Sequence, residues 1–171
     1  MDPLLIVLYP GSVGDVLKQR IKQQRFDGPA QEAILNLLVA AAHVRQMVDE
    51  ACAGAEITHG QYNALRILRG AHPKGYPRCE IAARMVERAP DVTRLIDRLE
   101  RRGLVERARV AEDRRLSITR ITRAGMEILR KLDPRVQVIH KHMSAKIASR
   151  DLRELSRICE AIYGDEVAEH P

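Results

Sequence analysis

Apolar residues recur at helical spacing in three long stretches of this chain. From Pro29 to Ala51 the spacings alternate between 3 and 4, which predicts one long helix with a narrow apolar seam. A second long helix is predicted after Thr122, because its stripe keeps phase through Pro134, and Ser149 is expected to cap a last one. The seams are Ile34, Leu37, Ala41, Val44, Val48 and Ala51; Leu129, Leu132, Val136, Ile139 and Met143; and Leu152, Leu155, Cys159 and Ile162.

Three short helices are predicted between the long ones. Thr58 and Gln61 have the spacing of a capping box, and the helix behind them should end near Gly70. A loop over 71–77 leads to a second helix at roughly 78–88. Pro90 opens a third helix, which Gly103 closes. The side chains expected to point inward are Tyr62, Leu65, Leu68, Ile81, Ala82, Met85, Val86, Val92, Leu95, Ile96 and Leu99.

A hairpin follows, with strands predicted at 104–110 and 115–121. Leu116 and Ile118 would share a face, whereas Ile121 breaks the alternation. Three short helices and a hairpin make a winged helix-turn-helix over 58–121. The expected fold is therefore mainly α with a small β-hairpin wing, a winged helix-turn-helix flanked by N- and C-terminal dimerisation helices.

The long helices, in 28–57 and 122–168, carry seams with no obvious partner inside so small a module. An unburied seam implies a second chain, so we expect a homodimer that reads a roughly palindromic site. Residues 1–27 form an N-terminal extension whose structure stays open between an arm, a short strand and an added helix. It holds the apolar run LLIVLY and a basic stretch with Lys18, Arg20, Lys22 and Arg25.

Positive charge is concentrated in one part of the chain. The net charge is +6, and residues 84–123 alone hold 12 arginines against 7 acidic residues. Such clustering is typical of a surface that contacts phosphates. Aromatic residues make up only 3% of the chain, which argues against a protein that stacks single-stranded bases on aromatic rings.

The sequence offers little for catalysis, metal binding or membrane insertion. The cysteines Cys52, Cys79 and Cys159 form no CxxC, and His140 and His142 project to different faces of a helix. Without a Gly-rich phosphate loop, GxSxG or HExxH, we expect no enzyme, no cofactor and no metal site. The LLIVLY run is too short to span a bilayer and lacks a basic flank, so a cytoplasmic protein without membrane contact is expected.

The cysteines are weighed as packing residues against redox sensors. Cys159 is expected to be buried on its seam, and the neighbouring Arg78 would favour the thiolate of Cys79. The packing interpretation is preferred for Cys159, and a redox role is disfavoured for Cys79.

Several motifs in order resemble one family. They are Ile57-Thr58 with Gln61, Glu80-Ile81-Ala82, VTRLIDRLERRGLVER at 92–107, Asp113-Arg114-Arg115, and Ile121-Thr122 with Gly125. Over about 30–165 the chain resembles winged-helix regulators of the multiple-antibiotic-resistance (MarR) type. The resemblance implies a homodimeric, sequence-specific regulator of double-stranded DNA, most often a repressor released by a small-molecule ligand. It also implies a recognition helix at 90–102 in the major groove and a wing at 104–121 at the minor groove.

The resemblance further implies which residues meet DNA. Thr93 and Arg94 would contact bases or phosphates with Arg98 close by, and Asp113 would hold Arg115 for insertion into the minor groove. Arg114 would meet solvent or phosphate. Two positions depart from the usual pattern: Asp91, which either reads a cytosine amine or favours the helix N-terminus, and Arg78, where a phosphate contact is expected. The predicted set is Arg78, Asp91, Thr93, Arg94, Arg98, Asp113, Arg114 and Arg115.

Two further interpretations stay open. Many relatives bind small aromatic or phenolic anions beside the reading head, and His43, Met47, Tyr62 and Leu65 are candidates to line such a pocket, or else simply pack the core and dimer. The alternative function is a winged-helix module that binds protein or RNA without operator specificity. The arginine-rich third helix and basic wing tip argue against it.

Overall fold

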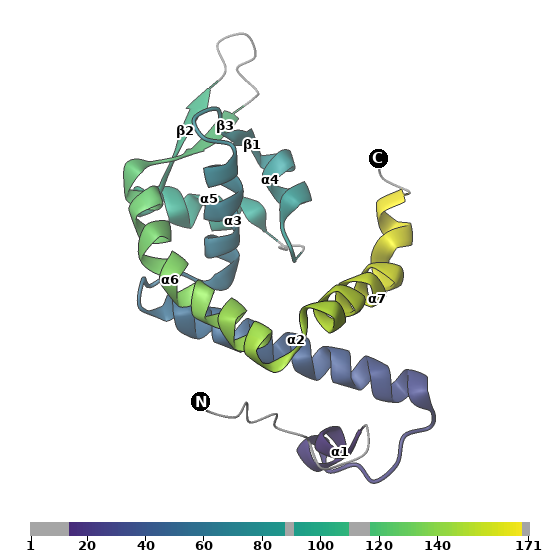
Figure 1. Ribbon diagram of the computed structural model, residues 1–171. Helices are drawn as coiled ribbons and strands as arrows, with labels where there is room; N and C mark the ends of the chain where they lie inside the picture. Colours follow the sequence, from purple (N-terminus) through teal and green to yellow (C-terminus); the bar gives the residue numbers. More distant parts are fainter. Residues whose placement is uncertain (1–13, 88–90, 110–116, 169–171) are drawn as a thin grey trace. The chain divides into compact units, whose positions relative to one another are not determined.

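The computed structural model describes residues 14–87, 91–109 and 117–168 (Figure 1). The chain divides into two compact units, residues 1–46 and 47–171, with the division inside a helix. Among the described residues no helix combines the length and apolar character needed to cross a membrane.

The first unit contains a helix that lies within the N-terminal extension. Helix α1 covers Asp15–Ile21, so the added helix is the correct one of the three alternatives for these residues, while the LLIVLY run lies outside the described residues. Helix α2, Pro29–Ala53, begins at the predicted proline. Its seam residues Ile34 and Leu37 are exposed within the chain.

The second unit holds the predicted winged helix-turn-helix. Its elements are α3 (His59–Gly70), β1 (Tyr76–Pro77), α4 (Arg78–Arg84), α5 (Val92–Arg101), β2 (Val105–Arg109) and β3 (Ser117–Ile121). Two long helices follow, α6 (Arg123–Lys146) and α7 (Ser149–Ala168). The capping box of α3 is confirmed, since Thr58 accepts from the Gln61 N–H and Gln61 accepts from the Thr58 N–H.

The described strands form a three-stranded antiparallel sheet in the order β1-β3-β2. The prediction of two strands missed β1, which pairs Tyr76 with Thr119 and Pro77 with Ile118. The predicted break of the β3 alternation at Ile121 is confirmed. Thr119 and Ile121 form the buried face, and Ile118 lies on the other one. A polar residue at a buried strand position hid the true phase.

Helix α4 is shorter than predicted. It ends at Arg84, because Met85 is extended and the next backbone N–H donates to the side chain of Asn63. Ala82 and Val86, both predicted inward, are therefore exposed, whereas Ile81 is buried and Met85 packs against the core. A pattern of apolar residues could not reveal a helix end imposed by a side chain 23 residues earlier.

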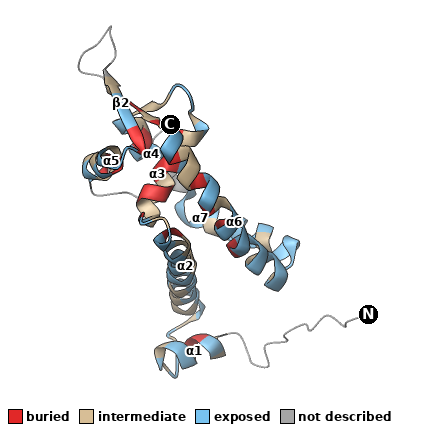
Figure 2. Ribbon diagram, turned by 90° about the vertical axis from the view of Figure 1, so that its left-hand side faces the viewer, coloured by how far each residue is buried: buried red, intermediate tan, exposed pale blue. Residues whose placement is uncertain are grey.

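One hydrophobic core joins the short helices to α6 (Figure 2). Leu129, Leu132 and Val136 of α6 are buried with Leu65 and Leu68 of α3. The first half of the α6 stripe therefore finds its partner within the chain, contrary to the expectation for this seam. α6 runs unbroken through Pro134, as predicted, and begins after the cap Thr122.

The start of α7 and its cysteine differ from the prediction. Ser149 is the first residue of the helix rather than its cap, because the Leu152 N–H already donates to the carbonyl of Ala148. Cys159 is half-buried instead of buried.

Candidate nucleic-acid interface

Helix α5 is fixed by its cap and its apolar face. The carboxylate of Asp91 accepts from the Arg94 N–H at 2.9 Å, which satisfies one of the unpaired donors of the first turn. Val92, Ile96 and Leu99 are buried beneath the helix, and Gly103 ends it with a φ of +68°. Pro90 lies outside the described residues. The open question about Asp91 is thus answered in part, since it caps the helix.

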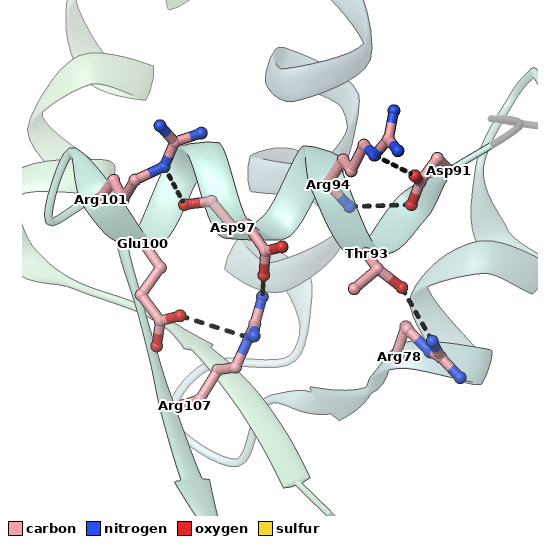
Figure 3. Close-up of polar contacts among 8 residues, drawn as sticks. All are labelled: Arg78, Asp91, Thr93, Arg94, Asp97, Glu100, Arg101 and Arg107. Carbon is pink, nitrogen blue, oxygen red and sulfur yellow. Dashed lines mark hydrogen bonds and ion pairs between the residues drawn. The ribbon is translucent and has the colours of Figure 1, made fainter.

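The opposite face of α5 is exposed and rich in arginine (Figure 3). The side chain of Arg94 is 79% exposed, and its Nε lies 2.9 Å from Asp91 Oδ2. Arg98 is exposed, with no ion pair among the described residues. Arg101 Nε donates to the Asp97 carbonyl at 3.4 Å. These guanidinium groups point to solvent, where they are available to an anionic partner.

Arg78 and Thr93 link α4 to α5. The Nη1 of Arg78 donates to the Thr93 hydroxyl at 2.8 Å, which brings these two predicted residues together (Figure 3). Arg78 is exposed, and among the described residues it has no carboxylate partner. The pair therefore presents an uncompensated positive charge beside the start of α5.

The wing strand is tied to α5 by Arg107, which the sequence analysis did not single out. Its guanidinium forms an ion pair with Asp97, and its Nε lies 3.5 Å from Glu100 Oε2. The available signal was an arginine in the strand that follows α5, ten residues after Asp97 and across a glycine turn. Asp113, Arg114 and Arg115, predicted to form the wing tip, lie outside the described residues.

The four predicted ligand-pocket residues have different environments. Tyr62 and Leu65 belong to the hydrophobic core, and burial raises the pKa of the Tyr62 hydroxyl while nearby Arg66 opposes the shift. Met47 is half-buried, and His43 is exposed on the part of α2 that belongs to the first unit. Of the cysteines, Cys52 is buried and Cys79 is exposed.

Comparison with known proteins identifies the family. Residues 57–117 match the model of the MarR family. An Escherichia coli protein named HTH-type transcriptional regulator PrsX is 30% identical over 123 residues, which cover 69% of this chain and 74% of that protein. A solved MarR transcription factor from Planctomyces limnophilus is 40% identical and covers 80% of this chain and 99% of its own, with a TM-score of 0.62. This chain belongs to the MarR family.

More distant MarR structures share the fold. The Staphylococcus aureus MepR–DNA complex is 18% identical and covers 75% of this chain and 94% of its own, with a TM-score of 0.69. CouR from Rhodococcus jostii RHA1, bound to p-coumaroyl-CoA, is 22% identical and covers 80% of this chain and 95% of its own, with a TM-score of 0.67. The mainly helical winged-helix fold is thus confirmed, and the MarR assignment makes the chain a transcription regulator rather than an enzyme.

Proposed function

We propose that this MarR-family chain is a homodimeric, sequence-specific regulator of double-stranded DNA. In this proposal α5, within the predicted segment 90–102, lies in the major groove, and the wing at 104–121 approaches the minor groove. The regulator acts as a repressor on a roughly palindromic operator and leaves it when a small aromatic or phenolic ligand binds.

The observation that carries the proposal is the two-sided character of α5. Ile96 and Leu99 pack one side of the helix into the core, whereas Arg94 and Arg98 are exposed on the other side. A helix held so firmly presents its arginines at fixed positions, and arginine is the side chain that most often reads guanine in the major groove. The arginine set favours this function over a module for protein or RNA.

The dimer is supported by apolar side chains that the single chain leaves in water. Ile34 and Leu38 on α2 are 58% and 60% exposed, and Ile162 on α7 is 65% exposed. Exposed apolar groups in rows along helices favour a second chain. Residues 28–57 and 122–168 would then hold the dimer, leaving 58–121 for DNA.

The ligand part of the proposal draws on the family. CouR, which shares the fold, is bound to p-coumaroyl-CoA. For this chain we keep Met47, Tyr62 and Leu65, which belong to one compact unit, as the proposed pocket residues. Since Tyr62 and Leu65 are core residues, ligand binding there would disturb the packing beneath the reading head.

Arg98 provides the main experiment. Binding of the wild type and Arg98→Ala to a promoter duplex of the protein's own locus is titrated beside a random duplex. We expect Arg98→Ala to bind the operator about 5- to 150-fold more weakly, because one base or phosphate contact contributes about 1–3 kcal/mol. Arg150→Ala, at an exposed arginine of α7, is the matched control and should bind like the wild type.

Two outcomes would overturn the proposal. One is a wild type that binds the promoter duplex no better than the random one, and preference for RNA over duplex DNA would instead favour the alternative module.

The other outcome concerns assembly. Sizing in solution should give a dimer at micromolar concentration, and Ile162→Asp should shift it toward monomer. A monomeric wild type contradicts the dimer.

A further inference from the structure

The end of α5 is bonded to two other helices by side chains that donate to backbone carbonyls. Arg102, the C-cap of α5, donates from Nη2 to the Ala55 carbonyl at 3.2 Å and from Nη1 to the Glu56 carbonyl. Both acceptors lie in the turn between α2 and α3. Thr122, the cap of α6, donates to the Gly103 carbonyl at 2.7 Å. The end of α5 is thus tied to the end of α2 and to the start of α6.

Arg135 adds the third bond, between α6 and α2. From the middle of α6, its Nη1 donates to the Ala51 carbonyl in the last turn of α2 at 3.3 Å. The guanidinium fits there because the neighbouring turn residue is Gly54, where an added Cβ would collide with that nitrogen. Carbonyls at the end of a helix lack a partner within it, so side chains from other elements can satisfy them. The three helices are therefore bonded pairwise in a triangle.

This triangle joins the helix proposed to read DNA to the segments proposed to hold the dimer. α5 belongs to residues 58–121, whereas α6 and the last turn of α2 belong to 122–168 and 28–57. In a symmetric dimer, the position of α5 on these helices sets the distance between the two copies of α5. We propose that the triangle, with Arg102 as its positioning residue, makes the protein selective for one half-site spacing. The inference rests on the proposed function and adds to it what determines the spacing.

The geometry of Arg102 suits a positioning role. Its planar guanidinium presents N–H groups in a fixed fork, and two of them bond successive carbonyls, which fixes direction as well as distance. Glu56 has a φ of +55°, a left-handed conformation that is uncommon for a residue with a side chain, and the two bonds favour it. The Glu56 carboxylate is 3.9 Å from Nη2 on a side chain that is 89% exposed, so this ion pair contributes little. Arg102 is thus explained without a DNA contact.

A spacer series tests the proposal. An operator is first selected from a random duplex pool with the full-length wild type, and its half-sites are then moved one or two base pairs closer together or further apart. We expect the wild type to prefer the selected spacing by about tenfold or more, the size of a base mismatch, and Arg102→Ala by about threefold or less. Arg130→Ala is the matched control, because the ion pair of Arg130 with Glu127 stays within α6. It should keep the wild-type spacing profile.

Two further variants separate positioning from loss of the fold. Arg102→Lys keeps the charge and one donor but not the fork, so it should recover part of the spacing preference. Gly54→Ala displaces only the flexible end of the Arg135 side chain, so the fold should persist while the spacing preference falls by a smaller factor than in Arg102→Ala. Urea denaturation establishes that each variant is folded during the titration. If Arg102→Ala does not fold, Arg102→Lys and Gly54→Ala decide the test.

The outcome for the spacing is separable from that for the function. At the selected spacing, Arg102→Ala should still prefer the operator over a duplex with scrambled half-sites, because its base contacts are intact. If the folded Arg102 and Gly54 variants keep the wild-type spacing profile, the triangle proposal fails and the function stands. Loss of sequence preference together with spacing preference in Arg102→Ala would instead make Arg102 a base contact and also overturn the proposal. If the wild type shows no operator preference, the function itself fails.

Discussion

Asp97 on α5 forms an ion pair with Arg107 on β2, and Glu100, one turn later, adds a second contact to the same guanidinium. One arginine thus sets the angle between the two elements proposed to enter neighbouring grooves. Because all three side chains are partly exposed, the contact contributes more to orientation than to stability.

Removing the ion pairs of Arg107 should reduce the stability of the fold only slightly and should reduce operator affinity more. We expect Arg107→Ala to lower the free energy of unfolding by about 1 kcal/mol or less. The loss in free energy of operator binding should be larger than this loss of unfolding free energy, because the wing is no longer held against α5. Urea denaturation and duplex titration measure the two effects. Glu106→Ala, at an exposed neighbouring position of β2, serves as control, and the charge-swapped pair Asp97→Arg with Arg107→Asp should recover part of the loss. A result identical to Glu106→Ala would contradict the coupling.

The helix caps should each contribute measurably to stability. Thr122→Ala should lower the free energy of unfolding by about 1–2 kcal/mol, since its Oγ1 both accepts from the Gly125 N–H at 3.2 Å and donates to the Gly103 carbonyl at 2.7 Å. Thr58→Ala should lose about 1 kcal/mol. Ser156→Ala is the matched control, because that hydroxyl bonds only within an exposed part of α7. Equal midpoints for all three variants in urea denaturation would refute the capping roles.

Gly125 should not tolerate a side chain. A Cβ there would lie 2.3 Å from the Leu104 carbonyl oxygen and 2.7 Å from Ile121 Cγ1, so backbone would have to move. We expect Gly125→Ala to lower the free energy of unfolding by about 1–3 kcal/mol in thermal or urea denaturation. At Gly70 nothing lies within 4 Å, and Gly70→Ala should be neutral or slightly stabilising. The prediction fails if both glycines respond alike.

Alkaline pH should lower the free energy of unfolding, partly because of the Cys52 thiol. Burial, with a smaller contribution from Asp49, raises the pKa of this thiol from 9.0 to about 11. The unfolded chain therefore releases the proton first, so stability is fully present below pH 9 and is lost as the pH rises toward 11. Urea midpoints at pH 8 and 10.5 should fall further for the wild type than for Cys52→Ala. Parallel losses in the two proteins would show that other groups cause the effect.

Helix positions could be predicted because their signals are local. The capping box at Thr58, the continuous stripe through Pro134 and the glycine that ends α5 all depend on residues within a few positions of one another. Strand β1 could not be found in this way. It is two residues long and exists only because Tyr76 pairs with Thr119, far along the chain.

The exposed arginines of the candidate site could likewise be predicted from the α5 pattern, whereas their partners could not. Asp91 stayed open between a base contact and a role at the helix N-terminus, and the structure shows that it caps the helix and pairs with Arg94. Arg107 and Thr119 could not be singled out from the sequence, because the contacts of a strand residue depend on which helix packs against its face of the sheet. Periodicity along one segment carries no information about that helix.

The sequence by itself determined the family, the order of the helices and the arginine-rich face of α5, since motifs, caps and apolar spacing act between near neighbours. Only the tertiary structure decided that Arg78 meets Thr93, that Asp97 and Glu100 share Arg107, and that Thr119 is buried opposite Arg107 in the sheet. These relationships join residues from different elements, and their distances are set by core packing and sheet register rather than by position along the chain.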